Sequence, residues 1–294
     1  MRSSDLLRLI ALAAIWGASF LFMRVIAPVL GALWTAEVRV GLAGIVLLAM
    51  MLFTQRAMNF RQNWKSFLIL GTVNSALPFA LYSYAALSIP AGYSAIVNAT
   101  SPLWGALMGA LFLGEQLTLR KMAGMAVGVA GVAFLVRLGP VEFSSKLVLA
   151  VFACVGATVC YAIVGVYTKK KLSAITPMQM ATGSQVGAGV VLLPFLPLVP
   201  VQGEITTTIA IVSVALALLC SAVAYLIYFR LMANVGPTKA LTVTFLIPLF
   251  ALLWGYLFLH ETITLNTAIG CAFVVLATWL VVFQPVKKSV ELAA

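Results

Sequence analysis

The chain has 294 residues, of which 63% are hydrophobic and only 9% are charged, and its net charge is +11 at pH 7. Soluble domains carry about a quarter charged residues, so this composition excludes a soluble globular protein and predicts a polytopic membrane protein. In a soluble chain the positive charge would suggest nucleic-acid binding. In a membrane protein basic residues mark cytoplasmic loops instead, so we expect no nucleic-acid partner.

Apolar segments separated by glycine, proline and charged residues predict ten transmembrane helices, because roughly 20 apolar residues cross the hydrocarbon core as a helix. The first segment follows Arg2 and Arg8, as in a signal peptide, but it has a counterpart later in the chain and is expected to be a retained helix. The uncharged stretch 66–114 is too long for one span and divides at SIPAG, residues 88–92. The predicted spans are 6–27, 33–54, 66–87, 91–113, 119–137, 147–168, 177–197, 207–229, 238–259 and 265–283.

Basic residues occupy alternate loops of this arrangement. The loops on the side opposite the N-terminus hold only Arg137 and Lys146. By the positive-inside rule, both termini are expected to be cytoplasmic. The basic residues on the N-terminal side are Arg2, Arg8, Arg56, Arg61, Lys65, Arg120, Lys121, Lys169, Lys170, Lys171, Arg230, Lys239, Lys287 and Lys288.

The four cysteines, Cys154, Cys160, Cys220 and Cys271, all lie within apolar runs. None has C-x-x-C spacing, and only His260 could join them as a ligand. We therefore expect small packing residues, with no disulfide framework and no metal site.

One apolar phrase occurs twice: SPLWGALMGALFLGEQLTLRKMAG at 101–124 and IPLFALLWGYLFLHETITLNTAIG at 247–270. Without a gap, the two copies align Pro102 with Pro248 and Glu115 with Glu261. Each half contains five predicted helices, an odd number, so the second half enters the membrane from the opposite side. The sequence predicts an all-α protein of two inverted five-helix repeats, residues 1–142 and 143–294, an arrangement typical of alternating-access carriers.

These features resemble the drug/metabolite transporter superfamily, specifically its ten-helix EamA-type exporters. The resemblance covers about residues 5–285 and is carried by IWGASFLFMR (15–24), AEVRVGLAGIVLL (36–48) and the two phrases ending in LFLGE and LFLHE; His260 stands where the first copy has Gly114. Within this group the chain is most similar overall to YddG-type exporters. The resemblance implies a bacterial inner-membrane exporter of aromatic and other neutral amino acids or similar small metabolites. No cofactor is implied.

Polar residues inside the spans predict a solute site, because polar groups in a membrane tend to face a cavity or another helix. Asn98 and Thr244 occupy equivalent mid-span positions, four residues before Pro102 and Pro248, and a proline frees the carbonyl four residues back. Small-residue stripes here also suit close helix packing. The predicted substrate-binding residues are Trp16, Ser19, Asn74, Tyr82, Ser94, Asn98, Tyr161, Tyr225 and Thr244, and the predicted helix-breaking prolines are Pro78, Pro102 and Pro248.

Three charges fall within spans: Arg24, Glu37 and Arg39. The short turn after the first span would let Arg24 and Glu37 approach as an ion pair, while Arg39 points to a different face. They form either a structural pair with a snorkelling arginine, or a gate or docking charge for a substrate carboxylate. Glu37 is the only acidic residue in a span and lies near the outer surface, a poor position for proton coupling at mid-membrane. We therefore expect a neutral or zwitterionic substrate that moves by facilitated diffusion, or by a coupling that the sequence does not reveal.

Other functions fit the sequence less well. A nucleotide-sugar carrier, or another metabolite or drug carrier of the same superfamily, is the main alternative; phosphate groups would need several inward-facing basic residues, and only Arg39 lies mid-span. A membrane enzyme would need a catalytic constellation that the spans do not contain, so we expect no enzyme. A scaffold would not need polar, proline-broken helices. The expected partners are a small-molecule substrate and the lipid bilayer, with the protein acting as a monomer or homodimer.

Overall fold

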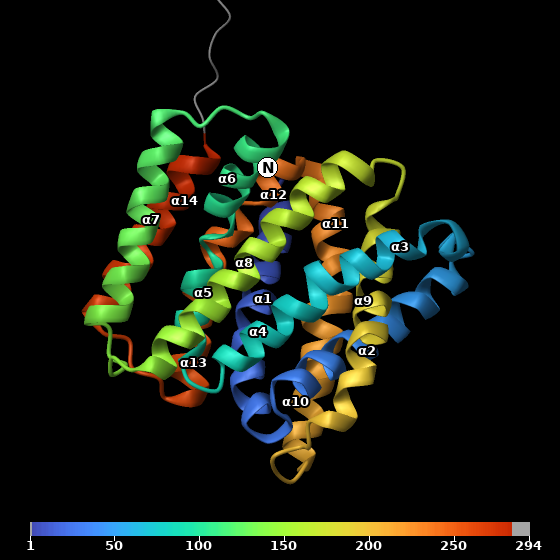
Figure 1. Cartoon of the computed structure of the whole chain (residues 1–294), viewed down its shortest axis with the longest axis horizontal. Coiled ribbons are helices and arrows are strands. Elements are labelled where there is room, and N and C mark those ends of the chain that lie inside the picture. The colour runs from blue at the N-terminus through green and yellow to red at the C-terminus, as the bar shows by residue number, and fades with distance from the viewer. Residues whose placement is uncertain (1, 284–294) are drawn as a thin grey trace, which may run out of the picture.

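A computed structural model describes residues 2–283, and its secondary structure in that range is entirely helical. Nine helical segments of this range are long and apolar enough to cross a membrane, and a shorter apolar helix, Val243–Leu259, joins them in the bundle (Figure 1). A membrane protein with about ten spans follows from this. The C-terminus, Lys287 and Lys288 are expected on the cytoplasmic side; they lie outside the described residues.

Several spans consist of more than one helical segment, because π-helical, 3₁₀ or turn residues interrupt them. The segments are α1 (Ser3–Leu30), α2 (Ala32–Phe53), α3 (Phe60–Leu70), π-helix η1 (Gly71–Ala76), α4 (Leu77–Ala85), α5 (Ala91–Asn98), α6 (Ser101–Leu113), α7 (Leu119–Leu138), α8 (Ser145–Lys171), α9 (Pro177–Leu192), 3₁₀-helix η2 (Leu193–Leu198), α10 (Thr207–Ala217), π-helix η3 (Leu218–Val223), α11 (Ala224–Val235), α12 (Pro237–Ala240), α13 (Val243–Leu259) and α14 (Leu265–Val282).

Most observed boundaries lie within a few residues of the predicted ones, with two clear exceptions at basic segments. The third span begins at Phe60 rather than near residue 66, and the eighth continues to Val235 rather than ending near 229. Arg61, Lys65 and Arg230 stop an apolar run, but lysine and arginine are good helix formers, so the helices continue past the hydrocarbon-length segment.

Two helices end in the left-handed conformation at aligned positions of the two halves. Gly114 follows α6 with φ 68°, and His260 follows α13 with φ 54°. Glycine adopts this conformation without a steric penalty, whereas a residue with a side chain is uncommon there. His260 nevertheless adopts it, so the two helices end in the same way despite the difference between Gly114 and His260.

The helices α7 and α14 pack chiefly against each other at one edge of the bundle (Figure 1). Glycines permit this close contact: a Cβ placed on Gly124 would lie 2.9 Å from the Ala277 carbonyl oxygen, and one on Gly131 would lie 2.7 Å from the Phe273 Cβ. Small residues commonly mediate such close helix contacts in membranes. The pair, which forms the fifth and tenth spans, is peripheral.

The two ends of the bundle differ in charge. We call the end with the start of α1 the N-terminal end; it also holds loops 54–59, 114–118 and 172–176. Here Asn234 donates to Asp5, with 2.8 Å between Nδ2 and Oδ1. The opposite, far end holds loops 86–90, 139–144, 199–206 and 260–264, and its backbone amide of Gln202 donates to the Val29 carbonyl at 2.8 Å. Within residues 2–283, basic residues gather at the N-terminal end.

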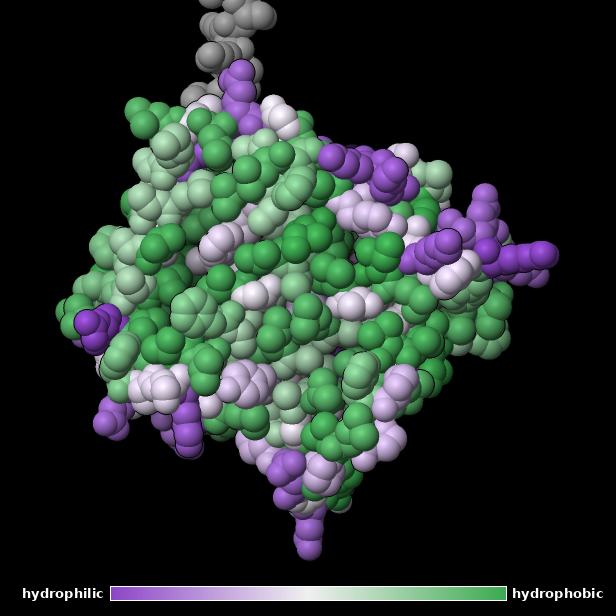
Figure 2. All heavy atoms as spheres, viewed as in Figure 1, coloured by the Kyte–Doolittle hydropathy of each residue, from purple (hydrophilic) through white to green (hydrophobic). Residues whose placement is uncertain are grey.

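Hydrophobic residues dominate the middle of the molecular surface. On the face shown in Figure 2, strongly hydrophilic residues lie at the margins and hydrophobic ones cover the centre. Large exposed side chains such as Leu111, Phe152 and Ile211 belong to this apolar surface. Such a surface suits a bilayer and would aggregate in water.

Candidate functional site

A cavity of about 330 Å³ lies in the middle of the bundle. Its walls come from both halves of the chain, including α1, α2, α4, α5, α8, α11 and α13, and its volume is within the range of small-molecule sites. The lining residues are Trp16, Ser19, Phe20, Met23, Arg39, Asn74, Phe79, Tyr82, Asn98, Ser101, Tyr161, Cys220, Tyr225, Tyr228, Leu241, Val243, Thr244 and Ile247.

The cavity brings together the residues predicted to bind substrate, with one exception. Ser94 is buried in α5 and does not line the cavity, because it lies one turn farther toward the far end than Asn98. The other eight predicted residues all contribute to the wall. Their contact with a substrate stays a prediction.

Aromatic rings form much of this wall. The Trp16 and Tyr228 rings lie 5.4 Å apart between centroids, and Phe20 meets Tyr82 edge to face, also at 5.4 Å. The Tyr82 and Tyr161 rings are 6.4 Å apart. Aromatic pairs at these spacings are attractive and stiff, so the wall offers flat apolar surface of defined shape.

Asn98 carries the main polar contacts of the cavity. The Tyr82 hydroxyl donates to its Oδ1 at 2.8 Å, and the Ser101 hydroxyl donates to its backbone carbonyl at 2.6 Å. The carbonyl that Pro102 frees is therefore bound by Ser101. The Nδ2 of Asn98 has no acceptor among the described residues, which leaves an amide donor for a solute.

Two π-helical segments, η1 and η3, interrupt the third and eighth spans next to the cavity. They begin 147 residues apart, at Gly71 and Leu218, close to the 146-residue offset of the repeated phrase. A π-turn adds a residue to the helix and rotates the following side chains, and it often occurs at functional sites. Asn74 of η1 and Cys220 of η3 both line the cavity.

A helix break coincides with one of the three predicted prolines. Residues 99–100 separate α5 from α6 shortly before Pro102, whereas Pro78 follows the π-helix η1 within a span that is helical throughout residues 60–85. Pro248 instead lies inside the continuous helix α13, and the break of the ninth span falls at 241–242. A proline forbids only the backbone bond to the residue four positions earlier, so a helix can continue through it when other contacts hold the segment.

The ion pair expected between Arg24 and Glu37 is not formed. Arg24 donates through Nη1 to the backbone carbonyl of Ala86 at the far end, and the Glu37 carboxylate lies beside Gly41 and Gly189. The expectation rested on the short turn between the spans, but the α2–α9 contact draws Glu37 to the other side of its helix. Arg39, expected to face elsewhere, lines the central cavity.

Sequence reasoning missed part of the cavity wall. The wall also contains Phe20, Phe79 and Tyr228. In a membrane span, aromatic residues are as common on packing surfaces as in binding sites, so the two phenylalanines could not be singled out from the sequence. Only Tyr228 had a signal, because it aligns with Tyr82 at the 146-residue offset of the repeated phrase. Ser221, a polar residue of the eighth span, does not itself line the cavity but accepts a hydrogen bond from Arg39, which does.

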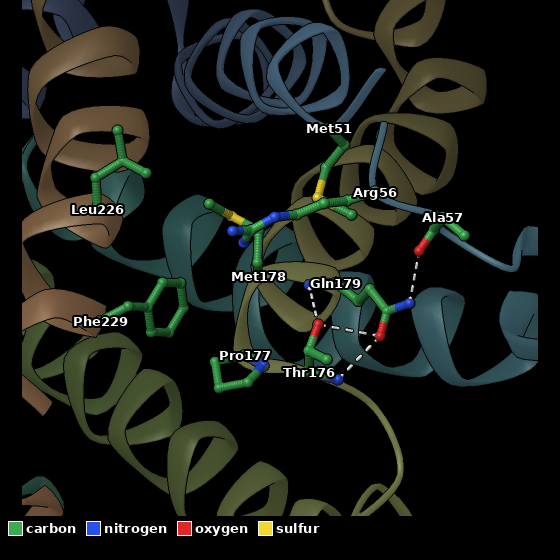
Figure 3. Close-up of a pocket in the computed structure, with 9 residues that line it drawn as sticks. All are labelled: Met51, Arg56, Ala57, Thr176, Pro177, Met178, Gln179, Leu226 and Phe229. Atoms are coloured by element: carbon green, nitrogen blue, oxygen red, sulfur yellow. Dashed lines mark hydrogen bonds between the residues drawn. The ribbon is translucent and has the colours of Figure 1, made fainter. Parts of the chain in front are cut away.

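A second hollow, of about 500 Å³, opens at the N-terminal end between α2, α9 and α11 (Figure 3). The side chain of Gln179 is engaged locally: it donates through Nε2 to the Ala57 carbonyl at 2.7 Å, and its Oε1 accepts from the Thr176 amide at 2.9 Å. Phe229 of this hollow stacks on Tyr225 of the central cavity, at 5.9 Å between centroids. The linings of the hollow and the central cavity therefore meet at the Tyr225–Phe229 pair.

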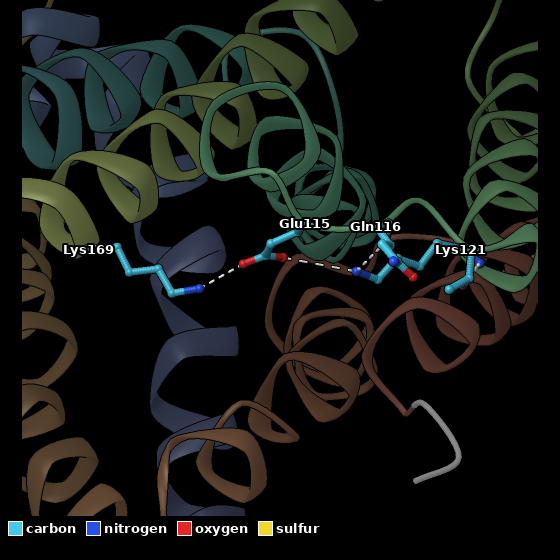
Figure 4. Close-up of polar contacts among 5 residues, drawn as sticks. Glu115, Gln116, Lys121 and Lys169 are labelled. Atoms are coloured by element: carbon cyan, nitrogen blue, oxygen red, sulfur yellow. Dashed lines mark hydrogen bonds and ion pairs between the residues drawn. The ribbon is translucent and has the colours of Figure 1, made fainter. Parts of the chain in front are cut away.

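Glu115 and Glu261, which align in the repeated phrase, have different partners. Glu261 accepts from the backbone amide of Ala91, at 3.0 and 3.1 Å from its two oxygens, at the start of α5. Burial raises the pKa of Glu261, and the Ala91 amide partly opposes that rise. Glu115 instead accepts from Lys169 at 2.7 Å and lies 4.0 Å from Lys121 (Figure 4), and Lys169 holds its pKa below the ordinary value.

Residues 2–283 contain no set of metal ligands: no three histidine, cysteine or acidic side chains lie close enough together to hold an ion. The four cysteines are buried as free thiols. The site is therefore an aromatic cavity with hydroxyl, amide and guanidinium groups, equipped to bind a small solute.

Several known proteins with similar sequences are named as transporters or exporters. The chain is 27% identical over 278 residues to the uncharacterized transporter YvbV of Bacillus subtilis, covering 92% of this chain and 88% of YvbV. It is 27% identical over 183 residues to a "probable terminal-alkyne amino-acid exporter" of Streptantibioticus cattleyicolor, covering 62% of this chain and 60% of the exporter. A solved crystal structure shares the fold with a TM-score of 0.66 and 20% identity, over 95% of this chain and 96% of the other.

The pattern of the EamA-like transporter family matches twice, over residues 4–137 and again over residues 148–283. The two matches together account for nearly all of the described chain, and the similarity to YvbV extends over most of both proteins. The chain is a multi-pass membrane protein that belongs to the EamA-like transporter family.

Proposed function

We propose that this transporter exports neutral amino acids, aromatic ones included, or similar small metabolites across a bacterial inner membrane. The observation that carries the proposal is the central cavity, which is lined by tyrosine, tryptophan and phenylalanine with a few amide and hydroxyl groups. Its volume of about 330 Å³ suits a single amino acid better than a nucleotide sugar. The similarity to an amino-acid exporter supports the same substrate class.

The mechanism we propose is alternating access by two inverted repeats, 1–142 and 143–294, with both termini in the cytoplasm. The two separate family matches and the aligned π-helices support the duplication. The gathering of basic residues at the N-terminal end supports a cytoplasmic location of that end. In such carriers the halves rock about a central site, which is where the cavity lies.

Solute counterflow with purified protein in liposomes tests this function. Liposomes loaded with unlabelled Phe, Trp, Met or Thr should accumulate the corresponding labelled amino acid, and a proton gradient should not be needed. Absence of counterflow for all four amino acids would refute the substrate assignment and favour another metabolite, drug or nucleotide-sugar cargo. Counterflow that requires the gradient would refute facilitated diffusion and direct attention to Glu37.

A further inference from the structure

Arg39 is a buried cation without a carboxylate partner. Its residue is 6% exposed, and its side chain lines the central cavity. The ion pairs among residues 2–283 all lie at the N-terminal end, and none includes Arg39. Buried charges are normally paired, so an unpaired arginine in a membrane-embedded cavity needs an explanation.

The nearest acidic residue in sequence does not supply the missing charge. Glu37 lies two positions earlier on α2, and its carboxylate lies beside Gly41 and Gly189 where α2 packs against α9. Residues two apart on a helix face different directions. No other acidic residue lies within a span of the described chain, apart from Asp5, which is bound by Arg8 at the N-terminal end.

The guanidinium is held in place by neutral groups. Its Nε donates to the Ser221 hydroxyl at 3.2 Å, its Nη1 lies 3.8 Å from the Met23 sulfur, and its Cζ lies 3.8 Å from the centre of the Phe79 ring. Ser221 belongs to η3, so the π-helical segment orients the arginine. The N–H groups on Nη2 have no acceptor among the described residues. A fixed, partly unused arginine fork matches the geometry of a carboxylate.

We propose that Arg39 binds the carboxylate of the transported solute, and that the solute's amino group is dispensable. Among the residues that line the cavity, Arg39 is the only charged one, so an ammonium group would meet only hydroxyl and amide oxygens and aromatic faces. The substrate class is then small monocarboxylates with an apolar or aromatic side chain, of which neutral amino acids are one part. This inference rests on the proposed function only in taking the cavity as the substrate site.

A ligand series on purified wild-type protein tests the inference without requiring transport. Phenylalanine and 3-phenylpropionate, which share the carboxylate, should raise the Tm of the protein with similar apparent affinities. Phenylalanine amide and phenethylamine, which lack it, should bind at least about tenfold more weakly, the loss expected for a charged hydrogen bond. Competition by the same four compounds against labelled phenylalanine in counterflow should follow the same order.

Substitutions of Arg39 provide the second arm. Arg39→Gln should weaken binding of both carboxylates by roughly 10- to 100-fold and leave phenethylamine binding unchanged. Arg39→Lys keeps the charge but loses the planar fork, so its affinity for the carboxylates should lie between those of the wild type and Arg39→Gln. Arg137→Gln, an arginine substitution at the far end of α7 outside the cavity, is the matched control and should behave as wild type. If Arg39→Gln does not fold, the lysine variant and the wild-type series still decide.

The outcomes separate this inference from the proposed function. Binding of the amide as tight as that of the free acid overturns the carboxylate anchor, even when amino acids exchange. Arg39-dependent binding of carboxylates without counterflow supports the anchor and refutes the amino-acid export function. Failure of all four compounds to bind overturns the anchor as stated.

Discussion

Asn98 is a polar residue that presents one unused hydrogen-bond donor to the cavity. Its side-chain oxygen accepts from Tyr82 and its backbone carbonyl accepts from Ser101, so both acceptors are engaged and the amide orientation is fixed. Only the Nδ2 donor remains. This donor belongs to a half-buried side chain that lines the cavity, and a solute carboxylate or carbonyl could accept from it.

Replacing Asn98 with alanine should lower counterflow about tenfold, because one hydrogen bond to a charged or polar solute contributes about 1.5 kcal/mol. The Tm in detergent should change little, since the Tyr82 hydroxyl can still reach water in the cavity. Asn63→Ala on α3, outside the cavity, is the matched control. A normal counterflow rate for Asn98→Ala would place the solute elsewhere.

Trp16 should select the solute by shape rather than by charge. Its ring packs 5.4 Å from that of Tyr228, so Trp16→Ala removes one aromatic wall of the cavity. We expect the apparent affinity for phenylalanine and tryptophan to fall more than that for threonine, because stacking contributes about 0.5–1.5 kcal/mol to aromatic side chains. Counterflow titrations with each amino acid measure this. The control is Trp279→Ala on α14, whose side chain is exposed at the surface, and it should leave every apparent affinity unchanged. If Trp16→Ala lowers the affinity for every amino acid equally, the role of Trp16 is purely structural.

At the scale of the element, the sequence predicts what depends on composition and misses what depends on neighbours. Apolar length placed nearly all the spans, and the polar mid-span residues Asn98 and Thr244 indicated the cavity. The π-helices η1 and η3 carry no such signal, because they form where tertiary contacts rotate a helix by one residue. Ser94 does not line the cavity although it shares α5 with Asn98, because it lies one turn closer to the far end and is buried there.

The contact between the third and seventh spans depends on glycine. A Cβ on Gly71 would lie 2.4 Å from the Ala188 amide nitrogen, and one on Gly187 would lie 2.3 Å from the Phe67 carbonyl oxygen. Because the obstructing atoms are backbone, the helices themselves would have to move apart.

Gly71→Ala and Gly187→Ala should each destabilise the protein by about 1–3 kcal/mol, the usual cost of overpacking a tight contact. The Tm of purified protein in detergent measures the effect. Gly105→Ala on α6 is the control, because nothing lies within 4 Å of its added Cβ. A Tm equal to that of the control would mean that these helices do not approach as closely in the membrane.

At the scale of the whole molecule, we infer that the cavity is closed at the far end and open toward the N-terminal end. Residues 91–97 of α5 are all buried, and α5 packs against α1 and α13, with Glu261 bound at its first amide. Leu241, which precedes α13 on the N-terminal side of the bundle, lines the cavity and is 41% exposed. The aligned Glu115 is bound by Lys169 instead of a helix start (Figure 4). These asymmetries are what one of two exchanging states would present.

Thiol accessibility tests which end is open at rest. In a protein whose native cysteines are replaced, Thr244→Cys lines the cavity on its open side and Ser94→Cys lies buried toward the far end. A membrane-impermeant thiol reagent should label Thr244→Cys in inside-out vesicles faster than in right-side-out vesicles, and a bound amino acid should slow that labelling. Ser94→Cys should resist the reagent from both sides while the far end is closed. Faster labelling of Thr244→Cys from outside would contradict either the cytoplasmic placement of the N-terminal end or the opening of the cavity toward that end at rest. A fluorescent fusion at the N-terminus, bright only in the cytoplasm, separates these two explanations.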